Sequence, residues 1–108
     1  FMKHVTPANF PAVIHNSGVP VVVMFYASWC TKCAMMKPIA EEISGKYHAQ
    51  YLFIEVDIDE SPLLAKTYTD DLVPTFVCFK NGTVLASFGG LISSSILEER
   101  LKEIFRKS

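Results

Sequence analysis

The stretch Ala27-Ser28-Trp29-Cys30-Thr31-Lys32-Cys33 separates two segments with different hydrophobic periods. Before it, residues 21–26 (VVVMFY) form a short apolar run, rich in β-branched and aromatic residues, which predicts a buried β-strand. After it, apolar side chains recur at helical spacing, at Met36, Ile39, Ala40 and Ile43. We therefore expect the two cysteines at a junction where a strand ends and a helix begins.

This position favours thiol chemistry. The first N–H groups of a helix are unpaired and carry partial positive charge, so they stabilise a thiolate, which is the reactive form of cysteine. Cys30 and Cys33 have two residues between them. In a first helical turn they are close enough to form a disulfide bond and to open it again with little backbone movement. The spacing indicates a reversible two-electron switch.

Length and composition predict a single domain over residues 1–108, with 50% hydrophobic residues to form its core. The net charge of -1 offers no basic excess that would favour nucleic acid or an anionic membrane. The longest apolar run, residues 19–27, is too short to span a bilayer, and no secretory signal is visible. Three cysteines, an odd number, argue against a disulfide-stapled secreted scaffold. We expect a cytoplasmic monomer with neither a nucleic-acid nor a membrane partner.

The rest of the chain alternates between strand and helix patterns. Strands are expected near residues 3–5, 51–58, 76–80 and 84–88, and Asn81-Gly82 predicts a tight hairpin between the last two. Thr6 is expected to cap a first helix, and Ser61 a short helix that ends near Tyr68. A last helix should begin in the serine cluster at residues 93–95, with Ser95 and Glu98 spaced as a capping box. The order β-α-β-α-β-α-β-β-α predicts an α/β fold with a mixed central sheet flanked by helices.

The chain contains several motifs in a fixed order, namely Trp29-Cys30-x-x-Cys33, Pro38 after the second cysteine, Val56-Asp57-Ile58-Asp59, Val73-Pro74-Thr75, Phe79-Lys80-Asn81-Gly82 and Gly89-Gly90. Through these motifs the chain resembles the thioredoxin family over nearly its whole length. The resemblance implies the thioredoxin fold. It also implies a thiol-disulfide oxidoreductase that exchanges a Cys30–Cys33 disulfide with its partners.

The resemblance also implies roles for individual residues. Cys30 is similar to the attacking nucleophile and Cys33 to the resolving thiol, and Pro74 corresponds to the family's cis proline beside the disulfide. The residues expected to contact substrate are Trp29, Val73, Pro74, Thr75, Gly89 and Gly90. The partners implied are proteins with disulfide bonds and an electron donor similar to thioredoxin reductase, with net reduction in the cytosol. Neither a cofactor nor a metal is expected.

The residues between the cysteines depart from the family pattern. Thioredoxins typically have Gly-Pro there, whereas this chain has Thr31-Lys32. The positive charge of Lys32 should stabilise the Cys30 thiolate and with it the dithiol form. We therefore expect a less reducing protein than an ordinary thioredoxin.

A second departure concerns a buried charged pair. The family's aspartate six residues before the first cysteine is Met24 here, and the lysine that usually neighbours it is Glu55. A lysine left without its carboxylate would be a costly unpaired charge, which explains why both positions differ together. Glu55 either supplies the missing base for Cys33, or it is partly solvated and Cys33 loses its proton to water.

A third departure lies in the loop before Pro74, where this chain has Asp70-Asp71-Leu72. Acidic groups beside the recognition surface would favour basic partners and repel acidic ones. The alternative is a solvated loop without a role in recognition.

Another class of function is also compatible with the sequence. A thioredoxin-like module could bind a partner on the surface of Trp29, Pro74 and Gly89, with cysteines that hold a metal or no longer react. His4, His15 and His48 lack the spacing of a zinc site. Cys78 lies in an apolar strand and is interpreted as a core residue.

Overall fold

The computed structural model describes residues 1–108 as five strands and four helices in the predicted order. The elements are β1 (Lys3–His4), α1 (Phe10–Asn16), β2 (Val21–Tyr26), α2 (Thr31–Lys46), β3 (Leu52–Asp57), α3 (Pro62–Tyr68), β4 (Thr75–Lys80), β5 (Thr83–Gly89) and α4 (Ser94–Arg106).

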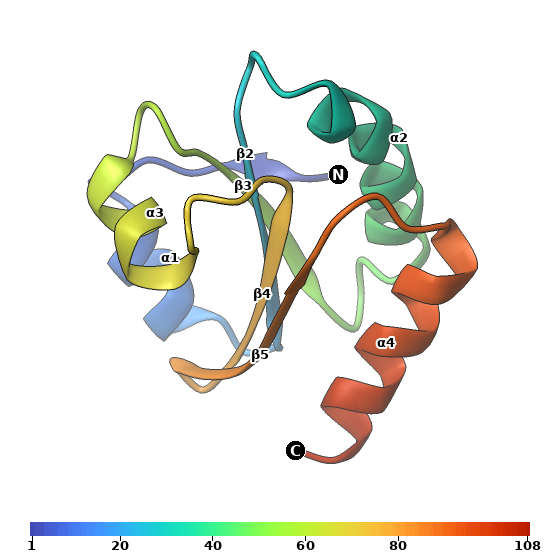
Figure 1. Cartoon of the computed structure of the whole chain (residues 1–108). Coiled ribbons are helices and arrows are strands. Elements are labelled where there is room, and N and C mark those ends of the chain that lie inside the picture. The colour runs from blue at the N-terminus through green and yellow to red at the C-terminus, as the bar shows by residue number, and fades with distance from the viewer.

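One mixed sheet forms the centre of the molecule (Figure 1), with the strand order β1-β3-β2-β4-β5. β2 pairs in parallel with β3 and antiparallel with β4, so it lies in the middle of the sheet. β4 and β5 form the antiparallel hairpin that Asn81-Gly82 predicted. Both turn residues have positive φ, 53° and 77°, which is the geometry of a tight two-residue turn. The prediction of an α/β fold with a mixed sheet is confirmed.

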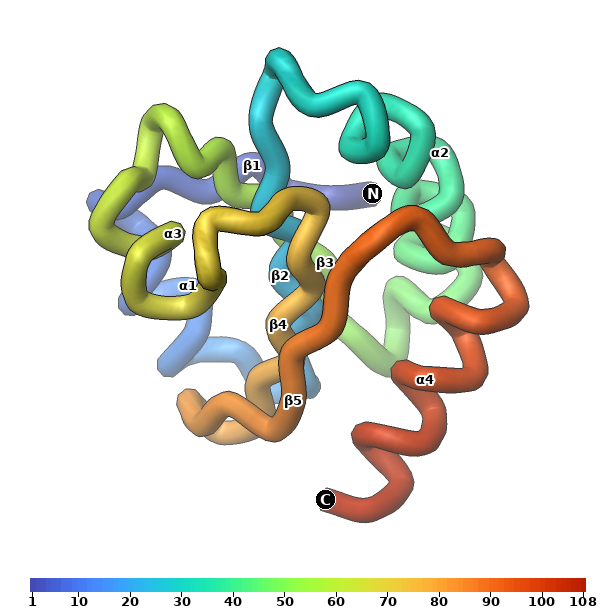
Figure 2. The backbone as a smooth tube through the Cα atoms, viewed as in Figure 1, coloured from blue at the N-terminus to red at the C-terminus, as the bar shows by residue number.

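Helices cover both faces of the sheet. The chain trace places α1 and α3 on one face and α2 and α4 on the other (Figures 1 and 2). Alternate residues of β2 enter the two layers: Met24 packs in the cluster that contains Cys33, whereas Phe25 packs in the cluster that contains Phe10. Because β2 is buried on both faces, its sequence is continuously apolar rather than alternating.

Two helix starts differ from the predictions. α1 begins at Phe10 with Asn9 as its N-cap, not at Thr6. The side chain of Asn9 accepts hydrogen bonds from the Thr6 backbone N–H (2.7 Å) and hydroxyl (3.1 Å), which closes a turn before the helix can start.

The last helix is capped by another serine of the predicted cluster. The Ser93 hydroxyl accepts a hydrogen bond from the Ile96 backbone N–H at 3.2 Å, so Ser93, not Ser95, is the N-cap. Glu98 takes no part in a capping box, because its carboxylate accepts hydrogen bonds from Lys46 (3.0 Å) and Tyr47 (2.8 Å). The contact of Glu98 with the end of α2 therefore replaces the capping box that was predicted within α4.

None of the four helices combines the length and the apolar character that a membrane span requires.

Candidate active site

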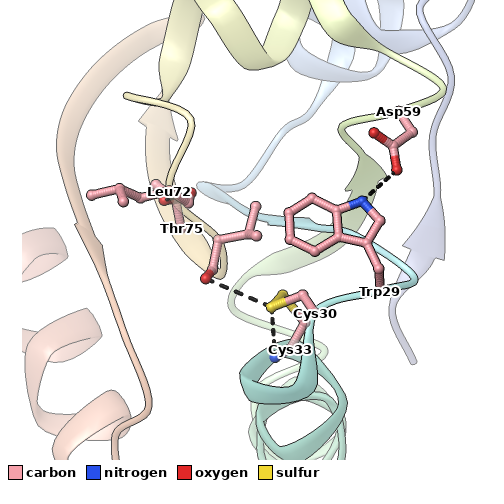
Figure 3. Close-up of a disulfide and its surroundings, with 7 residues drawn as sticks. Trp29, Cys30, Cys33, Asp59, Leu72 and Thr75 are labelled. Atoms are coloured by element: carbon pink, nitrogen blue, oxygen red, sulfur yellow. Dashed lines mark hydrogen bonds between the residues drawn. A yellow bond between two sulfur atoms is a disulfide. The ribbon is translucent and has the colours of Figure 1, made fainter.

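The two neighbouring cysteines lie where β2 gives way to α2. Cys30 is the N-cap of α2, and its sulfur accepts a hydrogen bond from the backbone N–H of Cys33 at 3.1 Å. The Cα atoms of the two residues are 5.2 Å apart, and their sulfurs form a disulfide bond (Figure 3). A backbone donor at a helix N-terminus thus points at the sulfur of Cys30. Once the bond is reduced, the same donor stabilises negative charge on that sulfur.

The two cysteines differ in exposure. Cys30 is 9% exposed and Cys33 is 3% exposed. A disulfide of another protein would therefore reach Cys30 first. This asymmetry agrees with the assignment of Cys30 as nucleophile and Cys33 as resolving thiol.

The Val73–Pro74 peptide bond is cis, as the resemblance implied, and lies beside the disulfide. The sulfur of Cys30 is 3.7 Å from the carbonyl oxygen of Val73. The Thr75 hydroxyl donates to the Leu72 carbonyl oxygen at 2.6 Å, and the Gly90 N–H donates to the Pro74 carbonyl oxygen at 3.1 Å. These bonds hold the loop before β4 and the end of β5 together next to Cys30.

A groove of about 470 Å³ runs along this side of the site. Five of the six residues expected to contact substrate line it, namely Val73, Pro74, Thr75, Gly89 and Gly90. Lys32 and Asp70 also line it and give it one positive and one negative side chain. Asp71 is exposed but is not among the lining residues.

Trp29, the sixth residue, does not line the groove. Its side chain is 65% exposed, and its indole N–H donates to the carboxylate of Asp59 at 2.9 Å (Figure 3). This bond fixes the direction of the ring next to Cys30. Trp29 therefore offers an exposed aromatic surface beside the reactive sulfur.

Glu55 lies next to Met24 in the register of β2 and β3. It is 8% exposed, so only a small part of this residue reaches solvent. Together with Cys30 and Cys33, Glu55 lines a second cavity of about 190 Å³. The structure thus brings a carboxylate and the resolving thiol to one cavity.

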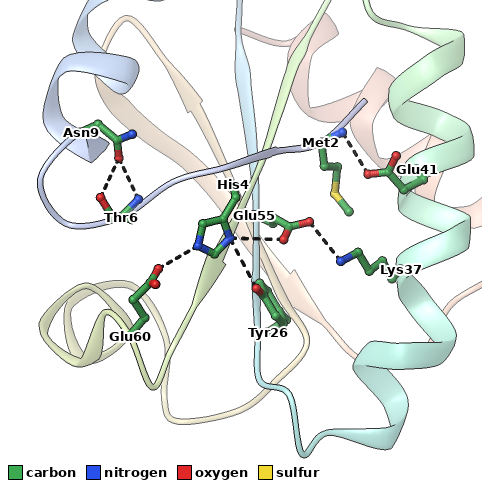
Figure 4. A network of polar contacts seen from close by, with 9 residues as sticks. All are labelled: Met2, His4, Thr6, Asn9, Tyr26, Lys37, Glu41, Glu55 and Glu60. Atoms are coloured by element: carbon green, nitrogen blue, oxygen red, sulfur yellow. Dashed lines mark hydrogen bonds and ion pairs between the residues drawn. The ribbon is translucent and has the colours of Figure 1, made fainter.

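Sequence reasoning missed the neighbours of Glu55. His4 from β1 and Lys37 from α2 both reach its carboxylate, and Tyr26 from β2 reaches the imidazole of His4 (Figure 4). No motif links these residues, because they come from separate elements. Only the parallel pairing of β1 with β3, which places His4 opposite Glu55, shows that they meet.

The third cysteine is separate from the site. Cys78 is fully buried in β4, and burial raises the pKa of its thiol to about 12. The interpretation of Cys78 as a core residue is confirmed. The structure shows no group of three or more His, Cys, Asp or Glu side chains that could hold a metal ion.

Comparisons with known proteins support the resemblance. The family model described as Thioredoxin matches residues 1–103. The chain is 35% identical over 100 residues to the chloroplastic thioredoxin Y2 of Arabidopsis thaliana, covering 93% of this chain and 60% of that protein. It is 30% identical over 102 residues to the thioredoxin of Porphyra purpurea, covering 94% of this chain and 95% of that protein. It is 38% identical over 96 residues to the mitochondrial thioredoxin of Bos taurus, covering 89% of this chain and 58% of that protein. The chain thus spans about three fifths of two of these relatives and nearly all of the third.

Proposed function

The chain belongs to the thioredoxin family of protein-disulfide oxidoreductases, and from this premise we propose that its Cys30–Cys33 pair reduces disulfide bonds in partner proteins. The observation that carries the proposal is the position of Cys30. Cys30 is the more exposed residue of the pair. Its sulfur accepts a hydrogen bond from the N–H of Cys33 at 3.1 Å and lies 3.7 Å from the carbonyl oxygen of Val73, which lines the groove.

The reaction starts from the dithiol. The Cys30 thiolate attacks one sulfur of the partner's disulfide, and the other partner sulfur leaves with the electron pair and takes a proton from solvent. A mixed disulfide now joins Cys30 to the partner. Cys33 loses its proton and attacks Cys30, which releases the second partner thiol and forms the Cys30–Cys33 disulfide. Two electrons have then passed from the protein to the partner.

The groove supports the assignment of the substrate as a segment of polypeptide. Residues 73–75, Gly89 at the end of β5 and Gly90 after it form part of the lining, so backbone groups face the groove there, next to larger side chains such as Tyr68 and Phe88. An extended segment can lie there and pair with backbone groups as an added strand, with its disulfide directed at Cys30.

The setting belongs to the same proposal. We propose a reducing compartment such as the cytosol, a monomer, and a reductase similar to thioredoxin reductase that returns the disulfide to the dithiol. The free buried thiol of Cys78 and the nearly balanced charge are compatible with this setting.

Trapping of the mixed disulfide tests the proposal. With insulin as the disulfide substrate and dithiothreitol as the reductant, the wild-type protein should accelerate reduction, and Cys30→Ser should abolish the acceleration. Cys33→Ser, reduced and then freed of dithiothreitol before insulin is added, should accumulate a covalent adduct through Cys30 that is visible by mass. Cys78→Ala is the matched control and should behave as wild type.

Two outcomes would contradict the proposal. One is a wild-type protein that leaves insulin reduction at the rate of dithiothreitol alone. The other is slow and equal alkylation of Cys30 and Cys33 in the reduced protein at about pH 5 to 6, which would indicate a binding module whose thiols are not activated.

A further inference from the structure

Glu55 has a partner on each side of its carboxylate. One oxygen lies 3.5 Å from the ammonium nitrogen of Lys37 on α2, and the other lies 3.4 Å from Nδ1 of His4 on β1 (Figure 4). An imidazole gains and loses its proton near neutrality, whereas the ammonium group of a lysine ordinarily does not. The charge that surrounds Glu55 therefore depends on the protonation of His4.

His4 has two further contacts, which differ in kind. Its Nε2 lies 2.8 Å from the carboxylate of Glu60, and its Nδ1 lies 3.5 Å from the hydroxyl of Tyr26. The imidazole is thus placed between two carboxylates and one hydroxyl. Its Nδ1 has two neighbours. The ionised carboxylate of Glu55 can only accept a hydrogen bond, whereas the hydroxyl of Tyr26 can also donate one.

The cavity beside Glu55 leads to the reacting sulfurs. It has a volume of about 190 Å³, and its lining includes the polar residues Glu55, Lys37, Tyr26 and Ser28 as well as Cys30 and Cys33. A site this large with several polar groups has room for water molecules that carry a proton. Glu55 is the one carboxylate among the lining residues.

We propose that His4 is a positioning residue for Glu55, and that its protonation sets how readily Glu55 takes the proton of Cys33 during release of the substrate. This inference rests on the proposed function, because it concerns the second step of that reaction.

The two protonation states of His4 give Glu55 different surroundings. The imidazolium donates from Nε2 to Glu60 and from Nδ1 to Glu55, so Glu55 faces two cations and takes another proton reluctantly. The neutral ring keeps its single N–H on Nε2, where the contact with Glu60 is short. Its Nδ1 then accepts the Tyr26 hydroxyl instead. Glu55 retains Lys37 alone and becomes a better proton acceptor.

The pKa values of His4 and Tyr26 support this change of hydrogen-bond partner at Nδ1. The hydrogen bond to Glu60 raises the pKa of His4 above its ordinary 6.5; partial burial opposes the rise, and the bond to Glu55 adds to it. Burial, with nearby Glu55 and Asp57, raises the pKa of Tyr26 to about 12, so its hydroxyl remains a donor. The other charged and titratable groups around His4 and Glu55 are Tyr26 on β2, Lys37 on α2, Asp57 on β3, Glu60 after β3, and Glu41 beyond Lys37.

The thiol proton of Cys33 moves through water in the cavity to the Glu55 carboxylate. The Cys33 thiolate attacks Cys30, the Cys30–Cys33 bond forms, and the bond between Cys30 and the substrate sulfur breaks. The electron pair leaves with the substrate sulfur, which takes a proton from solvent. Glu55 returns its proton to solvent before the next turnover.

The test measures the attack by Cys30 and the release by Cys33 as separate rates, over a range of about pH 5.5 to 8.5. Reduced protein is mixed with excess insulin, quenched with acid, and analysed by mass for mixed disulfide and for the released, oxidised protein. In wild type, the rate of release should rise through the pKa of His4. In His4→Gln this rise should be absent, and release at pH 5.5 should be about two- to fivefold faster than in wild type, as expected for one partly exposed ion pair. Glu55→Gln should slow release about 100-fold at pH 8.

Two controls make the result specific. His15→Gln alters an exposed histidine on α1 that makes no side-chain hydrogen bond, and it should keep the wild-type profile. In a Cys33→Ser background, which isolates the attack of Cys30, His4→Gln should leave the pH profile unchanged.

Three results would overturn the inference. They are a release profile in His4→Gln that matches wild type, release in Glu55→Gln at the wild-type rate, and a His4→Gln effect that is as large on the attack step as on release. In each case insulin reduction by wild type at pH 8 would still stand, so the proposed function would survive. Loss of that wild-type activity would remove both proposals.

Discussion

A Cβ atom on Gly89 would lie 2.8 Å from the carbonyl oxygen of Pro74. Backbone cannot retreat as a flexible side chain can, so alanine at this position must push the end of β5 away from the loop beside Cys30. We expect Gly89→Ala to lower the free energy of unfolding by about 1 to 3 kcal/mol, as for other overpacked sites, and to slow insulin reduction. Urea denaturation measures the first effect. Gly18→Ala, where a Cβ meets nothing within 4 Å, is the control. Equal stability of the two variants would show that the loop adapts freely.

Lys32 should make the protein a weaker reductant. It is exposed, follows Cys30 by two positions and lines the groove, so its charge favours the thiolate of the dithiol form. We expect the wild-type potential to be less negative than the thioredoxin value of about -270 mV, and Lys32→Gln to shift it toward more negative values. Equilibration with glutathione measures both, with the exposed Lys66→Gln as control. A wild-type potential at or below the thioredoxin value would refute this expectation.

Asp70 should bias the choice of substrate by charge. It lines the groove, whereas its neighbour Asp71 does not. Peptide disulfides flanked by lysine should be reduced a few-fold faster than those flanked by glutamate, and the difference should shrink in Asp70→Asn and with added salt. Asp71→Asn is the matched control. If both variants weaken the preference equally, the loop acts through its general charge and not through the groove.

Cys78 should remain unreactive in the folded protein. Burial raises the pKa of its thiol to about 12, so almost no thiolate forms at pH 8. Iodoacetamide should modify the reduced protein at Cys30 first and leave Cys78 unmodified, as peptide mapping would show. In urea all three cysteines should react. Labelling of Cys78 under native conditions at a rate near that in urea would indicate that β4 opens readily.

His4 should make stability depend on pH. The pKa of His4 is raised in the folded protein, chiefly by Glu60, so its ion pairs contribute fully below the unfolded value of 6.5. Their contribution is lost as the pH rises through the higher folded pKa. The stability advantage of wild type over His4→Gln should therefore decline from about pH 5.5 to 8.5, as read from urea midpoints. An advantage that grows over this range would mean that the ion pairs are not formed.

Local patterns predicted the frame of the site well. The change of hydrophobic period around Cys30 placed the strand and the helix correctly, because burial on both faces of β2 and on one face of α2 determines their sequences. Asn81-Gly82 predicted the hairpin for an equally local reason, the positive φ angles of its turn.

Contacts between distant segments could not be predicted in this way. Glu98 left the predicted capping box for Lys46 and Tyr47 on another helix. His4 and Lys37 reach Glu55 only through the sheet register and the docking of α2. In each case a polar side chain had several possible partners, and the tertiary fold decided among them.

The central position of β2 in the sheet has a consequence for hydrogen exchange near the active site. β2 is hydrogen-bonded along both edges, whereas β1 and β5 each have one free edge. In deuterated solvent, amide protons of such a doubly paired strand are among the last to exchange, because only wide opening of the molecule frees them. Cys30 comes four residues after the end of β2, whereas the end of β5 that lines the groove belongs to an edge strand. We therefore expect the reactive sulfur to lie close to the slowest-exchanging strand, and the amides at the end of β5 to exchange sooner.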